Sequence, residues 1–290
     1  MELKTYLQQH YSPTATAGYE MMIGRYILAM GDRAADAGYS DVLAYIGLLR
    51  EQGLHPKSLR NNLFAIKIYY RYLLACGRRK DHPCQYLNLK DRINRAIAVE
   101  SFYTRETLEA FYERWQSKNP AHQQRDKIIV GLLVYQALTV LEISQIRPGD
   151  IDLDKGTVRI RGNAKNKGRV LNLKPNQVLL FHNYLKNDYK RYRRQQKGGS
   201  RPDCFLPDDQ GRRFCPGSIN RLINQGRDRE CRLLPLRIRQ SVIARLLREN
   251  NDIRVVQEFA GHRYAGSTEA YKQTGLAELK AVIDRLHPLQ

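Results

Sequence analysis

Residues 258–273, EFAGHRYAGSTEAYKQ, place His262 directly after a glycine and Tyr271 nine residues later. A tyrosine hydroxyl has a pKa of about 10, so it reacts at neutral pH only beside a base or a cation. The simpler interpretation of such a pair is a histidine and a tyrosine packed in a core, because both side chains are common there. The choice between these interpretations depends on what the rest of the chain places around the pair.

The charge balance of the 290-residue chain favours a polyanionic partner. Lys and Arg number 49 against 29 Asp and Glu, which gives a net charge of +20. Such an excess favours nucleic acid as the partner; a basic protein without such a partner is the alternative. Hydrophobic residues make up 42% of the chain, which allows a sizeable core.

Neither a membrane nor a metal is expected as a partner. No apolar run approaches the roughly 18 residues that span a bilayer. The start, MELKTYLQQHY, lacks the cationic and apolar regions of a signal peptide. The five cysteines are scattered without a Cys-x-x-Cys pair, which argues for reduced thiols and against structural zinc. We therefore expect a cytoplasmic protein without structural zinc.

Hydrophobic periodicity predicts a mainly α protein with two domains. Residues 1–95 have the pattern of an all-helical domain, and the strongest helix is SLRNNLFAIKIYYRYLLACG, residues 58–77. Residues 96–290 have the pattern of further helices around two short strands, TVRIRG and RVLNL, which should form a small antiparallel sheet. The boundary falls in a linker near residues 93–103.

The helix predicted over residues 58–77 carries positive charge away from its apolar face. Leu63 and Ile66 belong to the apolar face, while Arg60, Lys67 and Arg71 lie elsewhere on the helix. A basic face of this kind can lie on DNA phosphates, and we expect these three cations to bind DNA. An ordinary solvated face is the alternative for each of them.

Two blocks of the second half resemble the tyrosine recombinases, the lambda-integrase family. Residues 132–173, LLVYQALTVLEISQIRPGDIDLDKGTVRIRGNAKNKGRVLNL, resemble the first motif block, which ends in a strand, a lysine-bearing hairpin and a second strand. Residues 236–273, LRIRQSVIARLLRENNDIRVVQEFAGHRYAGSTEAYKQ, resemble the second block without a gap from DIRVVQEFAGH to Tyr271. The resemblance spans nearly the whole chain and implies an Xer-like layout, with a SAM-like core-binding domain before the catalytic domain.

The resemblance implies a site-specific recombinase or integrase, which cuts and rejoins double-stranded DNA through a 3′-phosphotyrosine intermediate. Tyr271 occupies the nucleophile position, and the covalent link conserves the phosphodiester energy, so neither ATP nor metal is required. His262 and Arg239 occupy positions that hold phosphate oxygens in the family. Lys165 is the best match to the general-acid lysine of the hairpin, and Lys167 is its rival. Either lysine could instead be a turn residue that contacts phosphate.

Two positions depart from the family pattern. Thr139 stands where the family has its first catalytic arginine, and Leu236 stands at the histidine of the His-x-x-Arg motif. The loss of one charged contact to the transition state costs about 3 kcal/mol, or roughly a hundredfold in rate. Arg237 or Arg147 could fill the gap, and some family members from conjugative elements also lack the first arginine.

Without such compensation, the chain would keep the fold and still bind DNA, but it would no longer cleave it. It would then be a DNA-binding regulator or an accessory subunit. The active recombinase is favoured by the presence of Tyr271, His262, Arg239 and a hairpin lysine, because binding alone has no chemical need for all four. An unrelated helical transcription factor would leave the two motif blocks unexplained.

The resemblance also implies an assembly on DNA, with the two domains forming a clamp. A dimer is expected on each site and a tetramer during exchange, with accessory DNA-bending proteins as further partners on the prokaryotic nucleoid. Residues 276–287, LAELKAVIDRLH, are predicted to form an amphipathic helix that docks on a neighbouring protomer. Packing of this helix on its own domain is the alternative.

Overall fold

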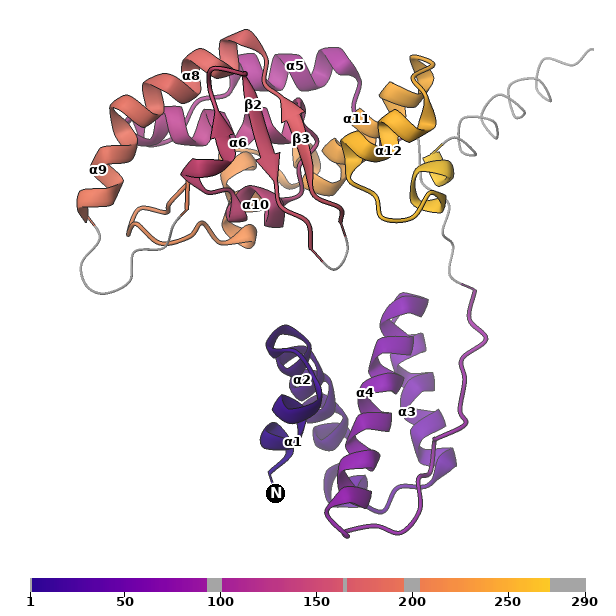
Figure 1. Cartoon of the computed structure of the whole chain (residues 1–290). Coiled ribbons are helices and arrows are strands. Elements are labelled where there is room, and N and C mark those ends of the chain that lie inside the picture. The colour runs from indigo at the N-terminus through magenta and orange to yellow at the C-terminus, as the bar shows by residue number, and fades with distance from the viewer. Residues whose placement is uncertain (1, 93–100, 164–165, 196–203, 272–290) are drawn as a thin grey trace, which may run out of the picture. The chain divides into compact units, whose positions relative to one another are not determined.

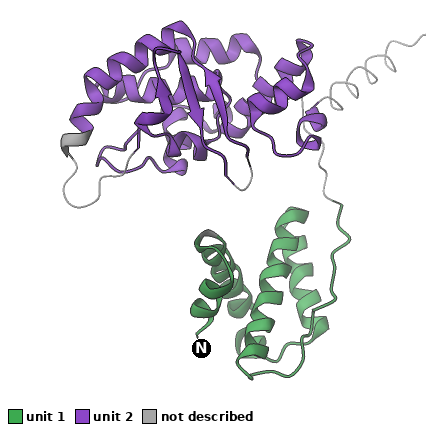
Figure 2. Cartoon of the chain, viewed as in Figure 1, with its two compact units in different colours: residues 1–95 green, residues 96–290 purple. Residues whose placement is uncertain are grey.

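The computed structural model describes residues 2–92, 101–163, 166–195 and 204–271 of the chain. The chain divides into two compact units, residues 1–95 and 96–290 (Figure 2). Each unit has a hydrophobic core of its own. The helix predicted at 276–287, most of the predicted linker and Lys165 lie outside the described residues.

Helices build the described part of the first unit (Figure 1). They are α1 (Leu3–His10), α2 (Pro13–Met30), η1 (Gly31–Ala34), α3 (Tyr39–Glu51) and α4 (Pro56–Ala75). Helix α4 is the amphipathic helix expected from the sequence, and it buries Leu63 and Ile66. Tyr70, a buried residue of α4, has its hydroxyl 2.6 Å from the Tyr26 hydroxyl of α2 and donates to the carbonyl of Ala34. These buried phenols therefore have the partners that burial of a polar group requires.

The second unit packs its helices around a small sheet (Figure 1). The helices are α5 (Arg105–Arg114), η3 (Pro120–His122), α6 (Gln123–Val134), α7 (Val140–Gln145), η4 (Pro148–Asp150), α8 (Pro175–Lys186), α9 (Asp188–Gln195), α10 (Pro216–Ile223), η5 (Arg229–Cys231), α11 (Pro235–Arg248) and α12 (Ile253–Ala260). The second half of helix α6, residues 128–134, is apolar on all sides and buries Ile128, Ile129, Leu132 and Leu133. A helix of that kind belongs in the middle of a domain, and α6 contacts α5, α8 and α11.

Three antiparallel strands form the sheet in the order β1 (Ile151–Asp152), β2 (Thr157–Ile160) and β3 (Arg169–Asn172). In the register of β2 and β3, Val158 pairs with Leu171 and Ile160 pairs with Arg169. Because side chains alternate along a strand, these four residues share the buried face. Strands β2 and β3 confirm the two predicted strands, whereas the two residues of β1 are too few to give a pattern.

The predicted mainly α fold with a small antiparallel sheet is confirmed. Helices α7, α11 and α12 and strand β3 position the candidate site, since α11 packs against α12 and α12 contacts β3. Across the described ranges, no helix combines the length and the apolar character needed to cross a membrane.

Candidate active site

The structure brings His262 and Tyr271 together at the end of α12. Helix α12 stops because Gly261 adopts the left-handed conformation, with φ at 69°, and His262 follows directly. The rings of His262 and Tyr271 are nearly parallel, at 10°, with centroids 6.3 Å apart. The Tyr271 ring also packs against a small apolar cluster that includes Val256 and Ala260. Tyr271 therefore contacts both an apolar cluster and the His262 ring.

Arg239 lies beside this pair and is held by backbone carbonyls. Its side chain is only 6% exposed. Nη1 donates to the carbonyl of Ala137 over 2.6 Å, and Nη2 donates to the carbonyl of Ala260 over 2.5 Å. Nη1 also lies 3.8 Å from Oε2 of Glu142. These contacts fix the guanidinium between the loop after α6 and the end of α12, in a place with little water.

Thr139 caps helix α7, at the position where the resemblance places an arginine. Its Oγ1 accepts from the backbone N–H of Glu142 over 3.2 Å, and its own N–H donates to Oε2 of Glu142 over 2.9 Å. The hydroxyl also donates to the same carboxylate oxygen over 3.0 Å. This reciprocal capping box occupies the Thr139 side chain, which brings no positive charge.

Leu236 is the other departure from the family pattern, and the structure gives the surroundings of this residue and of the two suggested compensating arginines. Leu236 is in the first turn of α11 and is 65% exposed. The Arg237 guanidinium lies over the ring of Tyr103, with Cζ 5.9 Å from the ring centroid. Arg147 is exposed just before η4, and its backbone N–H donates to Asp150.

The β2–β3 hairpin is attached to the turn that carries His262. The backbone N–H of Lys167 donates to the carbonyl of Gly261 over 2.8 Å, and Asn166 pairs with His262 in an isolated antiparallel bridge. Lys167 and His262 line the same pocket of about 440 Å³, together with Gly168, Arg254, Gln257 and Glu258. The rival lysine of the hairpin therefore lies beside the candidate histidine, whereas Lys165 is outside the described residues.

Burial and neighbouring charge keep His262 neutral. Burial, with the Arg239 and Arg169 guanidinium groups, lowers the pKa of His262 to about 4. Its Nδ1 is hydrogen-bonded to Oγ1 of the buried Thr268 over 2.9 Å. The neutral ring can therefore use Nε2 toward a ligand.

Burial raises the pKa of the Tyr271 phenol, whereas Arg239 and a hydrogen bond with Gln240 lower this pKa. The hydroxyl is therefore protonated at neutral pH and must lose its proton to a base as it attacks. In the part of the chain that the structure describes, no three His, Cys, Asp or Glu side chains gather as metal ligands.

Arg169 is a buried arginine of this site that the sequence reasoning missed. Its Nη1 donates to Oε1 of Glu142 over 2.7 Å, and both side chains are 1% exposed. The strand pattern carries a signal for this burial. Arg169 is on the same face of β3 as the buried Leu171, whereas Val170 is on the other face and is 61% exposed. An arginine on the inward face of a strand needs a buried partner, which only the fold identifies as Glu142.

Comparison with known proteins decides the family. The profile of the phage integrase family matches residues 102–276, more than half of the chain. The chain belongs to this family. The tyrosine recombinase XerA of Thermococcus kodakarensis is 27% identical over 284 residues, covering 96% of this chain and 92% of the relative. The tyrosine recombinase XerC of Bacillus pumilus is 24% identical, covering 97% of this chain and 93% of the relative.

Solved structures share the fold of this phage integrase family member. The XerH site-specific recombinase bound to difH substrate superposes with a TM-score of 0.62 at 18% identity, covering 92% of this chain and 77% of that one. The Tn1549 transposon integrase in complex with circular intermediate DNA has a TM-score of 0.61 at 17% identity, covering 96% and 99%. The predicted resemblance to the tyrosine recombinases is confirmed.

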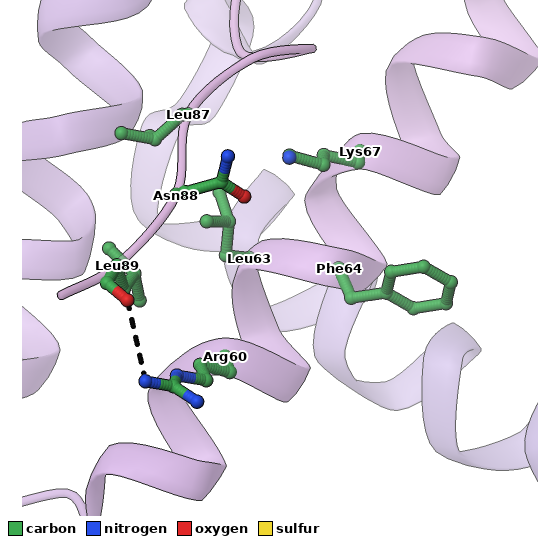
Figure 3. Close-up of a pocket in the computed structure, with 7 residues that line it drawn as sticks. All are labelled: Arg60, Leu63, Phe64, Lys67, Leu87, Asn88 and Leu89. Carbon is green, nitrogen blue, oxygen red and sulfur yellow. Dashed lines mark hydrogen bonds between the residues drawn. The ribbon is translucent and has the colours of Figure 1, made fainter. Parts of the chain in front are cut away.

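The first unit of this phage integrase family member presents the basic stripe predicted on α4. Arg60, Phe64, Lys67 and Arg71 follow at spacings of four, three and four residues, which puts them on one side of the helix. Arg60, Phe64 and Lys67 line a pocket of about 360 Å³ that the segment after α4 closes on its other side (Figure 3). Arg60 Nη2 donates to the carbonyl of Asp91 over 2.7 Å, so this arginine also holds that segment in place.

Lys67→Ala and Arg71→Ala are each expected to weaken DNA binding by a similar factor for all sequences, because phosphate contacts carry no base information. Each substitution should reduce the slope of log affinity against log salt by about 0.9. Fluorescence anisotropy over a salt series measures this slope. Lys4→Ala, on the exposed side of α1, is the matched control. An unchanged slope in both α4 variants would contradict the assignment of this stripe to DNA.

Gly261→Ala is expected to impair DNA cleavage as well as stability. A Cβ here would collide with Nη1 of Arg169 and lie 3.0 Å from the carbonyl oxygen of Lys167. The left-handed backbone adds about 1 kcal/mol for alanine. Gly226 has a similar φ of 72° with nothing within 4 Å, so Gly226→Ala should show only the conformational cost. Urea unfolding and cleavage rates compare the two variants, and equal cleavage rates would contradict the close packing at Gly261.

Proposed function

We propose that the chain is a site-specific recombinase that cuts and rejoins double-stranded DNA through a 3′-phosphotyrosine bond at Tyr271. The observation that carries this proposal is the placement of Tyr271 and His262, with parallel rings, beside the buried guanidinium of Arg239. Membership of the phage integrase family and the similarity to XerA and XerC recombinases support it.

In the proposed reaction, the Tyr271 hydroxyl oxygen attacks the scissile phosphorus. A bond forms between phosphorus and the tyrosine oxygen, and the bond from phosphorus to the 5′-oxygen breaks. The tyrosine proton passes to a base, and the leaving 5′-oxygen receives a proton from the hairpin lysine. Lys165 matches the family position, while Lys167 has the support of its shared pocket with His262. The 5′-hydroxyl of a partner strand then reverses these steps.

Arg239 and His262 are proposed to bind the non-bridging oxygens of the same phosphate. Negative charge on these oxygens increases in the phosphorane-like transition state, where fixed donors in a dry site stabilise it most. The guanidinium of Arg239 is already held by two carbonyls, and the Nδ1 of His262 is held by Thr268. Neither group needs to reorganise when the charge develops.

The proposed partners are DNA and further copies of the chain. XerH and the Tn1549 integrase are bound to DNA in the structures that share this fold, which supports a duplex as the partner. We infer a dimer on each site and a tetramer during exchange, with residues 276–287 linking protomers and DNA-bending proteins assisting. Arg60, Lys67 and Arg71 on α4 would contact phosphates and position the first unit.

Covalent capture tests the proposed function on genomic DNA, so the recombination site does not have to be chosen in advance. Tagged protein is incubated with sheared genomic DNA from its own source, denatured in detergent and recovered, and the attached DNA is sequenced. The expected result is enrichment of one defined sequence joined to the protein. DNA that binds before denaturation but is entirely lost afterwards would instead support a regulator or accessory subunit.

A further inference from the structure

We propose that Arg169 is the second guanidinium of the active site and supplies the positive charge that Thr139 cannot. This inference rests on the proposed recombinase function and names a further residue whose charge stabilises the transition state of that reaction. Arg169 lies on β3, at the strand end next to the hairpin. Arg147 and Arg237, suggested by sequence adjacency, are not needed for this role.

Glu142 links Arg169 to the position where the family has its first arginine. Oε1 of Glu142 accepts from Nη1 of Arg169 over 2.7 Å, while Oε2 accepts from the backbone N–H of Thr139 over 2.9 Å. One carboxylate therefore contacts both the cap of α7 and the guanidinium from β3. A positive charge is thus present beside residue 139, although it comes from a different element of the fold.

Arg169 and Arg239 meet at the turn that carries His262. Nη2 of Arg239 donates to the carbonyl of Ala260, and Nη1 of Arg169 lies against Gly261 without room for a Cβ. Both guanidinium groups also contribute to the low pKa of His262. The two charges are therefore close enough to act on one anion bound at this histidine.

The buried site holds more positive charge than its carboxylate neutralises. Glu142 lies 2.7 Å from Arg169 and 3.8 Å from Arg239, so one carboxylate serves two guanidinium groups. Nε of Arg169 is buried, and it has no hydrogen-bond partner within the described part of the chain. A buried N–H of a cation is costly to leave unpaired, and a phosphate oxygen is a strong acceptor for it.

A pocket beside this cluster could admit a phosphate to His262. Its lining includes His262, Lys167 and Gly168, and Gly168 directly precedes Arg169 in the chain. A scissile phosphate that reaches His262 therefore lies at the same end of β3 as Arg169. The excess charge, the unpaired Nε–H and the adjacent pocket together indicate an anion site that the ion pair with Glu142 alone does not explain.

Arg169→Gln is expected to slow cleavage about a hundredfold to a thousandfold while non-covalent DNA binding persists. The substitution also leaves Glu142 buried without its partner, so a loss of fold could produce the same result. The double variant Glu142→Gln with Arg169→Gln removes both charges of the ion pair, so that neither partner is left buried without the other, while Arg239 stays charged. If the double variant folds and still cleaves slowly, the proposal is supported; cleavage at the wild-type rate would overturn it.

A scissile methylphosphonate separates the charge of Arg169 from its packing. In this substrate a methyl group replaces one non-bridging oxygen and removes the negative charge of the diester. Wild type and Arg169→Gln should then differ by less than about tenfold, because the missing cation has less charge to stabilise. Arg125→Gln, which breaks a buried pair with Asp126 elsewhere in the unit, is the matched control. An equal deficit of Arg169→Gln on both substrates would overturn the proposal.

Adduct formation by the wild-type protein distinguishes this proposal from the function on which it rests. If the wild type forms no covalent adduct with DNA, the recombinase function itself fails. If the wild type forms the adduct and Arg169→Gln forms it at the same rate, only the role of Arg169 fails. A slow Arg169→Gln variant that recovers on the methylphosphonate supports both.

Discussion

Arg239→Gln is expected to lower the single-turnover rate of DNA cleavage by about a thousandfold while DNA binding persists. The Arg239 guanidinium is 6% exposed and donates to the carbonyls of Ala137 and Ala260, so its position is fixed before DNA arrives. A fixed charge in a dry site stabilises a phosphorane-like transition state without reorganisation. The rate is measured on a short duplex that carries the captured site, with gel-shift binding alongside.

Arg239→Lys is the matched variant for charge. Lysine keeps the positive charge but lacks the planar fork that serves both carbonyls and a phosphate, so we expect a rate between those of the wild type and the glutamine variant. Each carbonyl left unpaired costs about 1–3 kcal/mol, so circular dichroism must show that both variants fold. A folded Arg239→Gln variant that cleaves within about tenfold of the wild-type rate would contradict the proposed role.

The second motif block was the part of the site that the sequence could predict. Arg239, His262 and Tyr271 lie on α11, at the end of α12 and just beyond it, in one ungapped stretch of chain. Their mutual positions depend on the left-handed turn at Gly261 and on the packing of two helices that are neighbours in the chain, α11 and α12. A pattern of residues at fixed spacing carries that information.

The charge around Thr139 could not be predicted in the same way. The spacing of Thr139 and Glu142 has the capping-box pattern, so the helix cap was present in the sequence. The partner of Glu142 is Arg169, which comes from a strand 27 residues away and reaches the carboxylate only through sheet register and helix packing. Arg147 and Arg237 were suggested by closeness along the chain, which says little about closeness in the fold.

Tyr271→Phe is expected to abolish DNA cleavage completely, because phenylalanine keeps the ring but has no oxygen to attack phosphorus. The ring packs against the cluster around Val256 and Ala260 and lies parallel to His262, so its shape should be preserved. Stability and DNA affinity should therefore change little. This substitution removes one oxygen atom and tests the chemistry with the least disturbance of the fold.

The most direct measurement uses a nicked duplex in which the nick lies next to the scissile phosphate, so that the released fragment diffuses away and rejoining is blocked. The wild-type protein should accumulate a denaturant-resistant DNA adduct, and peptide mapping should place the DNA on Tyr271. Tyr271→Phe should bind the same duplex with the same affinity and form no adduct. An adduct that persists in Tyr271→Phe, or its absence from a wild-type protein that binds the site, would contradict the account.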